Sequence, residues 1–150
     1  MLVPASGGTG VDVIAILDID GVLADASHRQ HLVARPPKDW DAFFAAVGGD
    51  EVIERGRQRL LDLSREHEIV LLSGRPERSR ADSVSWLERQ GIAAGRVVLR
   101  PDDDHRPAST LKAELIRLIS DPVDTAVVID DDVTVVDRLR GMGYRTELFA

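Results

Sequence analysis

Short apolar runs alternate with amphipathic stretches along most of this chain. Runs rich in Val, Ile and Leu predict buried strands at residues 13–18, 69–73, 96–99, 125–129 and 145–148. Apolar positions at helical spacing predict helices at about 39–47, 52–67, 78–90 and 133–141, and another that begins with Ser109 as its N-cap. Strands that alternate with helices are typical of right-handed crossovers. The pattern therefore predicts an α/β fold with a doubly wound, Rossmann-like parallel sheet of five main strands.

Two stretches lack this regular pattern. Residues 1–10 are small and Gly-rich and predict a flexible tail ahead of one domain at 11–150. Residues 24–50 contain one short helix with an aromatic face, formed by Trp40, Phe43 and Phe44. The gaps between elements are too short for a large cap domain, so we expect a small flap over 24–50. The open site that results either admits a large substrate, such as a nucleic-acid end, or borrows a lid from a second subunit of a homodimer.

Composition limits the classes of protein that fit. With 150 residues, 43% of them apolar and 30% charged, the chain has the make-up of one globular domain. It has no apolar run near the ~18 residues of a membrane span and no signal peptide, so we expect a cytoplasmic protein with no membrane partner. Zero cysteines exclude disulfides and thiolate metal sites. The net charge of −7 disfavours broad nucleic-acid binding but is compatible with a local basic patch.

Carboxylates directly follow two of the predicted strands. Asp18 and Asp20 stand at positions i and i+2, a spacing that points both side chains to one side of an extended backbone, and Gly21 allows a sharp turn after them. Asp130 follows the fourth strand. Ligands of a doubly wound sheet bind beyond the carboxyl ends of its strands, so these carboxylates should meet there. Because three carboxylates repel one another, we expect a hard cation between them, and Mg²⁺ suits such a site.

This set of groups is suited to phosphate chemistry. With an ordinary pKa near ~4, Asp18 would be ionised at neutral pH and able to attack phosphorus. Asp20, crowded by other carboxylates, is expected to have a raised pKa and to serve as a general acid and then a general base. A hydroxyl and backbone N–H groups at Ser73 and Gly74, with the ammonium of Lys112, would complete a phosphate cradle.

Four segments of the chain resemble the four motifs of the haloacid dehalogenase (HAD) superfamily phosphohydrolases: residues 18–25, 73–75, 112 and 130–132, within a match over about 13–148. The resemblance implies that Asp18 forms an aspartyl-phosphate and that Asp20 is the general acid and base. It implies that Ser73 and Lys112 hold the phosphoryl group.

The same resemblance implies a metal site. Its ligands to Mg²⁺ would be Asp18, the backbone carbonyl of Asp20, and Asp130, with Asp131 in support. Asp132 has no fixed role in the family and is a candidate helix N-cap.

Within the superfamily, the chain is most similar to the 3′-phosphatase domain of phage-type polynucleotide kinase-phosphatase. The likeness rests on Ser73-Gly74-Arg75, on Trp86 in the following helix, and on Arg100 twelve residues before Lys112. It implies that Arg75 and Arg100 bind phosphate oxygens through their guanidinium forks. No kinase P-loop is present, and Trp86 is expected in the core rather than against a base.

Two groups of charged residues allow two interpretations each. His28, Arg29 and His31 either line the entrance of the site or form a solvated loop. The arginines at 75, 78, 80, 100 and 106 form either a local basic patch or a solvated face.

The expected function is that of a Mg²⁺-dependent phosphomonoesterase acting on polynucleotide 3′-phosphate ends or nucleotides. The alternatives are a small-metabolite phosphatase or phosphotransferase and a catalytically silent HAD-fold binding protein. Intact Asp18, Asp20, Lys112 and Asp130 argue against the silent protein.

Overall fold

A parallel sheet forms the centre of the protein in a computed structural model that describes residues 14–93 and 95–150. In spatial order its strands are β5 (Arg96–Arg100), β4 (Glu68–Pro76), β1 (Ile14–Leu17), β6 (Thr125–Asp130) and β7 (Thr146–Leu148). The central strand β1 pairs with β4 and β6, so that Leu17 lies opposite Leu71 and Ile129. The five-stranded α/β prediction is confirmed, whereas the predicted tail at 1–10 lies outside the described residues.

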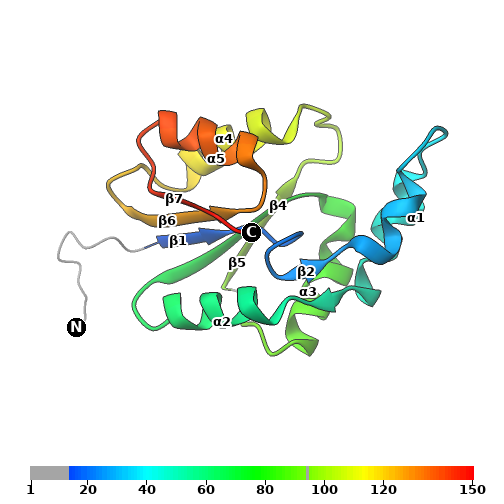
Figure 1. Cartoon of the computed structure of the whole chain (residues 1–150), viewed down its shortest axis with the longest axis horizontal. Helices are drawn as coiled ribbons and strands as arrows, with labels where there is room; N and C mark the ends of the chain where they lie inside the picture. The colour runs from blue at the N-terminus through cyan, green and yellow to red at the C-terminus, as the bar shows by residue number, and fades with distance from the viewer. Residues whose placement is uncertain (1–13, 94) are drawn as a thin grey trace.

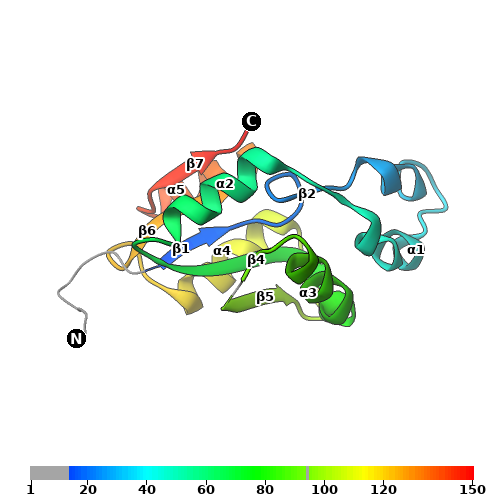
Figure 2. The ribbon, with the colours of Figure 1, turned by 90° about the horizontal axis from the view of Figure 1, so that it is seen from below.

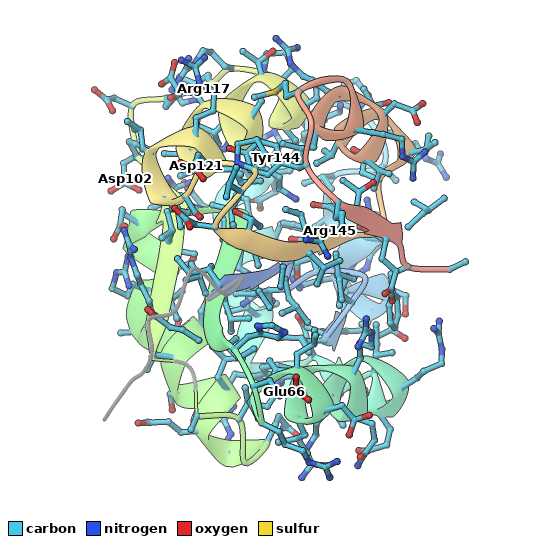
Figure 3. The ribbon with its side chains drawn as sticks, turned by 90° about the vertical axis from the view of Figure 1, so that its left-hand side faces the viewer. Glu66, Asp102, Arg117, Asp121, Tyr144 and Arg145 are labelled. Carbon is cyan, nitrogen blue, oxygen red and sulfur yellow. The ribbon has the colours of Figure 1, made fainter. Side chains whose placement is uncertain are left out.

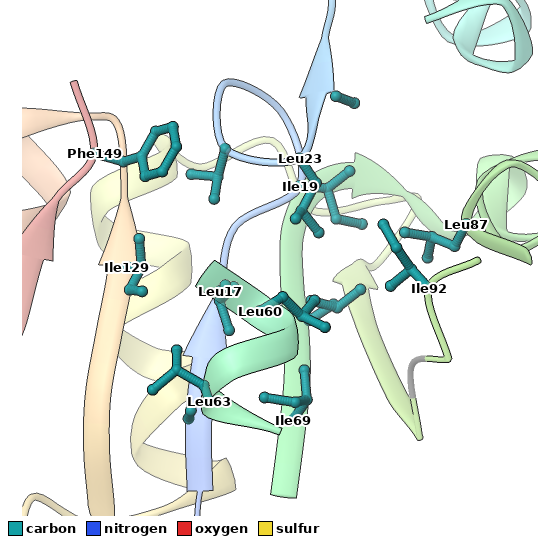
Figure 4. Packing of buried hydrophobic residues seen from close by; sticks show 14 of the residues in the cluster. Leu17, Ile19, Leu23, Leu60, Leu63, Ile69, Leu87, Ile92, Ile129 and Phe149 are labelled. Carbon is teal, nitrogen blue, oxygen red and sulfur yellow. The ribbon is translucent and has the colours of Figure 1, made fainter. Parts of the chain in front are cut away.

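Helices cover both faces of this sheet. Figures 1 and 2 show α2 (Glu54–Leu63) and α3 (Arg80–Arg89) on one face, and α4 (Ala108–Ile119) and α5 (Val133–Gly141) on the other. Side chains of a strand alternate between the two faces, so each face of β1 has its own core. Leu17 packs with Leu60 and Leu63 of α2, as Figure 4 shows, whereas Ile16 packs with Ile116 of α4. The apolar runs in the sequence are therefore explained by the burial of the sheet on both faces.

A buried tyrosine lies near the end of the sheet at which the strands begin. Figure 3 looks at that end and shows Tyr144 close to Arg117 and Asp121. The hydroxyl of Tyr144 donates a hydrogen bond of 2.7 Å to the carbonyl of Ser120. Burial, and then the charge of Asp121, raises the pKa of Tyr144 above its ordinary value. The opposite end of the sheet, where the strands terminate, is the end that carries the acidic side chains.

Residues 24–52 lie beyond that opposite end. They form the 3-10 helix η1 (Ser27–Leu32), the helix α1 (Trp40–Ala45), the turn η2 (Val47–Gly49), and a small ribbon of β2 (Ala24–Asp25) and β3 (Glu51–Val52). The ribbon is antiparallel, with Ala24 opposite Val52. In Figures 1 and 2, η1 and α1 project past the sheet on the side where its strands end.

The structure corrects several predicted boundaries. Strand β4 extends to Pro76, because that residue still pairs with Arg100 of β5 after a shift in register. Helix α2 ends at Leu63, four residues before the predicted end, and the turn η3 (Glu77–Ser79) precedes α3. Ser109 is not an N-cap: α4 begins at Ala108, directly after the extended Pro107, and has no side-chain cap. None of the helices described at 14–93 and 95–150 is long and apolar enough to cross a membrane.

Candidate active site

Three carboxylates and one ammonium meet where β1 and β6 end. One oxygen from each of Asp18, Asp130 and Asp131 lies within 4.8 Å of the others. Lys112 reaches them from the second turn of α4, with Nζ 3.2 Å from Asp18 Oδ1 and 2.7 Å from Asp130 Oδ2. These residues line a pocket of about 470 Å³, which we call the acidic pocket. The structure thus brings together residues that are more than 100 positions apart in the sequence.

Asp18 is buried at the base of the acidic pocket. Its Oδ1 accepts a hydrogen bond of 2.9 Å from the backbone N–H of Ile19. Burial raises the pKa of Asp18 well above its ordinary value; Lys112 opposes this effect, and Asp130 adds to it. The expectation of an ordinary pKa for Asp18 was therefore wrong, because the sequence alone does not show how completely the strand end is removed from water.

Lys112 is buried but stays charged. Burial lowers the pKa of this ammonium, but the charges of Asp18 and Asp130 outweigh burial and raise the pKa above its ordinary value. Asp130 is held in turn by the backbone N–H of Asp132, which donates 3.0 Å to Oδ1. Asp132 itself caps α5 through a hydrogen bond of 2.9 Å from the N–H of Thr134, so its predicted role as an N-cap is confirmed.

Asp20 also lines the acidic pocket, and its carboxylate is held by two arginines. Its Oδ1 accepts from Arg75 Nη2 at 2.8 Å and from Arg29 Nη2 at 2.9 Å, and its Oδ2 accepts from Arg75 Nε at 3.1 Å. Burial raises the pKa of Asp20, but the charge and hydrogen bonds of Arg75, followed by Arg29, outweigh it, and the net pKa lies below the ordinary value. The prediction of a raised pKa for Asp20 was therefore wrong.

Asp50 joins the two arginines, and sequence reasoning missed it. Its Oδ1 accepts from Arg29 Nε at 2.8 Å, and its Oδ2 accepts from Arg75 Nη2 at 3.1 Å. His28 Nε2 lies 2.6 Å from Oδ1. We call these five residues, including Asp20, the Asp50 network. Asp50 follows Gly48 and Gly49 in the sequence as an ordinary turn acid would, so no local signal distinguishes it.

Arg29 takes a different place from the one expected. It neither lines the entrance nor lies in a solvated loop: the side chain is fully buried, and its guanidinium carbon lies 4.3 Å from the ring centre of Phe43. His28 and His31 on the same 3-10 turn are exposed. Trp86 is fully buried, as expected for a core residue, and its Nε1 donates 2.7 Å to the backbone carbonyl of Asp50.

The predicted phosphate-binding residues do not all line the acidic pocket. Ser73 is buried, and its Oγ accepts a hydrogen bond of 3.1 Å from the N–H of Arg75. Gly74 lines the acidic pocket. Arg100 lies outside that pocket, and its guanidinium donates to the backbone carbonyls of Gly74, Asp104 and Arg106. The arginines expected as a patch or a solvated face are largely paired with carboxylates, as Arg80 is with Glu77 at 2.7 Å.

The donor set fits a hard divalent cation. All three clustered side chains offer carboxylate oxygens, which are the ligands that Mg²⁺ prefers. Gly21 allows the carboxylate of Asp131 to lie close to the backbone after β1. Its φ is +83°, and a Cβ on it would overlap that carboxylate. Only glycine adopts this backbone conformation freely while leaving that space open.

Comparisons with known proteins agree with this geometry. The family model of the polynucleotide kinase PNKP phosphatase domain matches residues 12–147. The fold is similar to that of a chain in the Pnkp1/Rnl/Hen1 RNA repair complex, with a TM-score of 0.76 and 22% identity over 96% of this chain and 44% of that one. This chain therefore spans less than half the length of that relative. No curated protein sequence matches it.

Two further structures share the fold. One is the class C acid phosphatase from Bacillus anthracis, with a TM-score of 0.65 and 18% identity over 92% of this chain and 66% of that one. The other is a HAD-family enzyme from Bacteroides thetaiotaomicron in complex with magnesium and inorganic phosphate, with a TM-score of 0.57 and 13% identity over 91% of this chain and 93% of that one. At these identities the likeness concerns the fold.

Proposed function

The chain belongs to the polynucleotide kinase PNKP phosphatase-domain family of HAD-type hydrolases, and we propose that it is a Mg²⁺-dependent phosphomonoesterase that forms an aspartyl-phosphate on Asp18. One observation carries the proposal: Asp18 lies beside the ammonium of Lys112 and in one cluster with Asp130 and Asp131. A nucleophile, a cation for the phosphoryl oxygens and a set of metal ligands are the parts that phosphoryl transfer needs in one place.

The proposed reaction has two steps. In the first, a carboxylate oxygen of Asp18 bonds to phosphorus, the bond to the leaving oxygen breaks, and Asp20 gives that oxygen a proton. In the second, Asp20 takes a proton from water, the water oxygen attacks phosphorus, and Asp18 and inorganic phosphate are released. Lys112 and Ser73 would bind the phosphoryl oxygens during both steps.

Mg²⁺ would be held by Asp18, Asp130 and the backbone carbonyl of Asp20, with Asp131 in support. Bound there, it would reduce the repulsion between Asp18 and the anionic phosphate. The burial that raises the pKa of Asp18 makes such a cation more important, because a nearby positive charge favours the ionised nucleophile. The Lys112 ammonium supplies the same kind of support from the α4 side.

Asp20 would be positioned by Arg75 and Arg29. Their hydrogen bonds favour the ionised carboxylate, which is the state that the second step requires of a base. For the first step Asp20 has to be protonated. The two arginines therefore favour the second step, in which Asp20 is a base, over the first, in which it is an acid. In this proposal Arg75 positions Asp20 and does not itself bind the phosphate. The guanidinium of Arg75 already donates hydrogen bonds to Asp20, Asp50 and Ser83.

The proposed substrates are polynucleotide 3′-phosphate ends or nucleotides. Support comes from the family model and from an architecture in which residues 24–50 would act as a small flap rather than a large cap. A large cap restricts many phosphatase sites to small molecules, whereas a small flap leaves room for a polymer end.

A substrate panel with Mg²⁺ tests this proposal. Phosphate release is compared for a 3′-phosphorylated oligonucleotide, a nucleoside 3′-phosphate and several sugar phosphates, with Asp18→Asn as the control for contaminating phosphatases. We expect the two nucleic-acid substrates to have higher kcat/KM than the sugar phosphates. Preferential release from sugar phosphates would indicate a metabolite phosphatase. An absence of release from every substrate would indicate a catalytically silent binding protein.

A further inference from the structure

A second hollow adjoins the acidic pocket and contributes nothing to the chemistry described above. It has a volume of about 390 Å³, and the residues around it include Trp40, Phe44, Arg78 and His105. We call it the aromatic hollow. Gly74 lines both this hollow and the acidic pocket, so the two are neighbours that share the end of β4.

The aromatic hollow has a flat and partly exposed hydrocarbon wall. Trp40 is 46% exposed, and its ring stacks on that of Phe44 with centroids 5.9 Å apart and planes at 21°. Phe43 meets Trp40 edge to face at 5.6 Å, and the buried Arg29 lies against Phe43. Three of the chain's six aromatic residues thus gather within α1. Arg29 of the Asp50 network supports this cluster through Phe43, and Lys38 Nζ lies 6.0 Å from the centre of the Trp40 ring.

The charges around the hollow are already balanced. Arg78 lies 3.3 Å from Asp41 and 3.7 Å from Asp102. Arg106 pairs with Asp104 at 2.7 Å and with Glu114 at 3.0 Å. Arg100 also lines the hollow and donates to backbone carbonyls, so three arginines stand beside four carboxylates. The hollow therefore lacks the excess positive charge that a surface tracking a phosphate backbone needs. The hollow is therefore suited to a flat, neutral ring with polar edges rather than to a row of phosphates.

Building on the proposed function, we infer that the aromatic hollow binds the base of the nucleoside that carries the scissile phosphate, stacked on Trp40 and unpaired. With the phosphate in the acidic pocket, the sugar would pass Gly74, where the two hollows meet. A volume of about 390 Å³ is near the lower end for small-ligand pockets and accommodates one base better than a base pair. Stacking on Trp tolerates every base, because each has a π face.

This assignment predicts a preference for single-stranded ends. A paired terminal base has to be unstacked and unpaired before it reaches Trp40, which costs free energy, and a frayed or mismatched end costs less. Recognition through one base also predicts that a nucleoside 3′-phosphate and an oligonucleotide 3′-phosphate are processed with similar kcat/KM and with little dependence on salt.

The decisive experiment compares two oligonucleotides that differ only at the 3′ terminus. Both carry a 3′-phosphate, one on a normal nucleotide and the other on a tetrahydrofuran abasic residue. The ratio of kcat/KM between them is measured for the wild type, Trp40→Ala, Trp40→Phe and Leu118→Ala. Leu118 is 77% exposed on α4 and serves as the matched control for the loss of an exposed apolar side chain.

We expect wild type and Leu118→Ala to favour the base-bearing substrate by about 5- to 150-fold, the range for stacking of one base on an aromatic side chain. Trp40→Phe should keep most of this ratio, and Trp40→Ala should bring it close to one. An equal loss on both substrates would overturn the inference by showing that Trp40 only supports the fold, and an unchanged ratio would overturn it too. Faster release from a blunt duplex than from a single strand would overturn the assignment of an unpaired base.

A binding measurement separates this inference from the phosphatase proposal. In the presence of EDTA, the base-bearing oligonucleotide should quench the fluorescence of Trp40 more strongly than the abasic one does. Trp40→Phe, which leaves only the buried Trp86, should abolish that difference. If the wild type releases no phosphate but shows base-dependent quenching, the phosphatase proposal fails and the base site stands. If release is rapid but the abasic substrate is equally good, the base site fails alone.

Discussion

Arg29 and Asp20 are joined by a hydrogen bond of 2.9 Å between Nη2 and Oδ1, and the arginine that reaches the carboxylate is fully buried. The chain leaves the sheet at Leu17, passes through Asp20 and β2 into η1, and there returns Arg29 to Asp20, nine positions earlier. The same guanidinium contacts Asp50, the last residue of the segment 24–50 that was predicted to be a flap and is called the flap segment here. One buried side chain therefore links the flap segment to the predicted general acid.

Arg29→Ala should lower the free energy of unfolding by about 3 kcal/mol in urea denaturation. Removing one partner of a buried ion pair costs ~3–5 kcal/mol, and the lower end applies because Arg75 still contacts both carboxylates. The matched control is Arg65→Ala, which removes an exposed pair with Asp62 at 3.5 Å and should change stability by no more than about 0.5 kcal/mol. Similar losses in both variants would show that the Asp50 network contributes little.

The buried position of Arg29 also fixes its effect on substrates. A side chain with no exposed surface does not bind the backbone of an oligonucleotide, so Arg29→Ala should lower the turnover of an oligonucleotide 3′-phosphate and of the matching nucleoside 3′-phosphate by the same factor. Steady-state kinetics on both substrates checks this. A selective loss on the oligonucleotide would place Arg29 at the substrate after all.

Asp18→Asn should abolish phosphate release from every monoester, because an amide does not form the acyl-phosphate. Uncatalysed hydrolysis of monoesters is so slow, with known accelerations up to ~10²¹, that no practical rate should remain. Asp137→Asn, an exposed change on α5, is the control and should keep wild-type turnover. More than about a tenth of wild-type turnover in Asp18→Asn would exclude the aspartyl-phosphate.

Asp20→Asn should lower turnover most for substrates with poor leaving groups. Protonation of the leaving oxygen matters most when that oxygen is strongly basic, so an alkyl phosphate should suffer more than p-nitrophenyl phosphate in the first step. Single-turnover kinetics on the two substrates separates this step from the hydrolysis of the intermediate. A uniform loss would argue that Asp20 acts only in the second step, for which its lowered pKa already suits it.

EDTA should stop phosphate release, and added Mg²⁺ should restore it. Asp130→Ala should raise the Mg²⁺ concentration at half-maximal activity, because it removes one of three clustered carboxylates and leaves Lys112 paired with Asp18 alone. A thermal melt gives an independent readout: Mg²⁺ should raise the Tm of the wild type and raise that of Asp130→Ala less. Full activity in chelator would rule out the metal site.

Gly56→Ala should destabilise the protein by about 1–3 kcal/mol, because a Cβ at this buried position of α2 would overlap the carbonyl of Val22. The displaced Val22 follows Asp20 by two residues, so turnover should fall as well. Gly141→Ala on α5, where a Cβ meets nothing within 4 Å, is the control and should be neutral or stabilising by up to ~1 kcal/mol. Urea denaturation of the two variants is the measurement.

The order of elements and the place of the principal acids follow from the sequence. Apolar runs such as 69–73 and the Asp18-x-Asp20-Gly21 spacing are local patterns, and a parallel sheet brings the ends of its strands together whatever the details of packing. For this reason the sequence assigns Asp18 and Asp130 to one site, whereas Lys112, which lies on a helix, was predicted as the ammonium of a phosphate cradle.

Tertiary structure decided what surrounds those acids. Arg29 and Asp50 are 21 residues apart, Arg75 and Asp20 are 55 apart, and no periodicity relates their positions. Which charges meet depends on the path of the flap segment, and this path determines that Asp20 has a lowered pKa and that Arg29 is hidden from solvent. The shared helical face of Trp40 and Phe44 could be anticipated, but only the tertiary structure places the partly exposed ring of Trp40 in the same hollow as Gly74. The local pattern of apolar and polar residues determines the order of strands and helices. Burial and contacts between residues distant in the sequence determine the charge state and the exposure of each functional group.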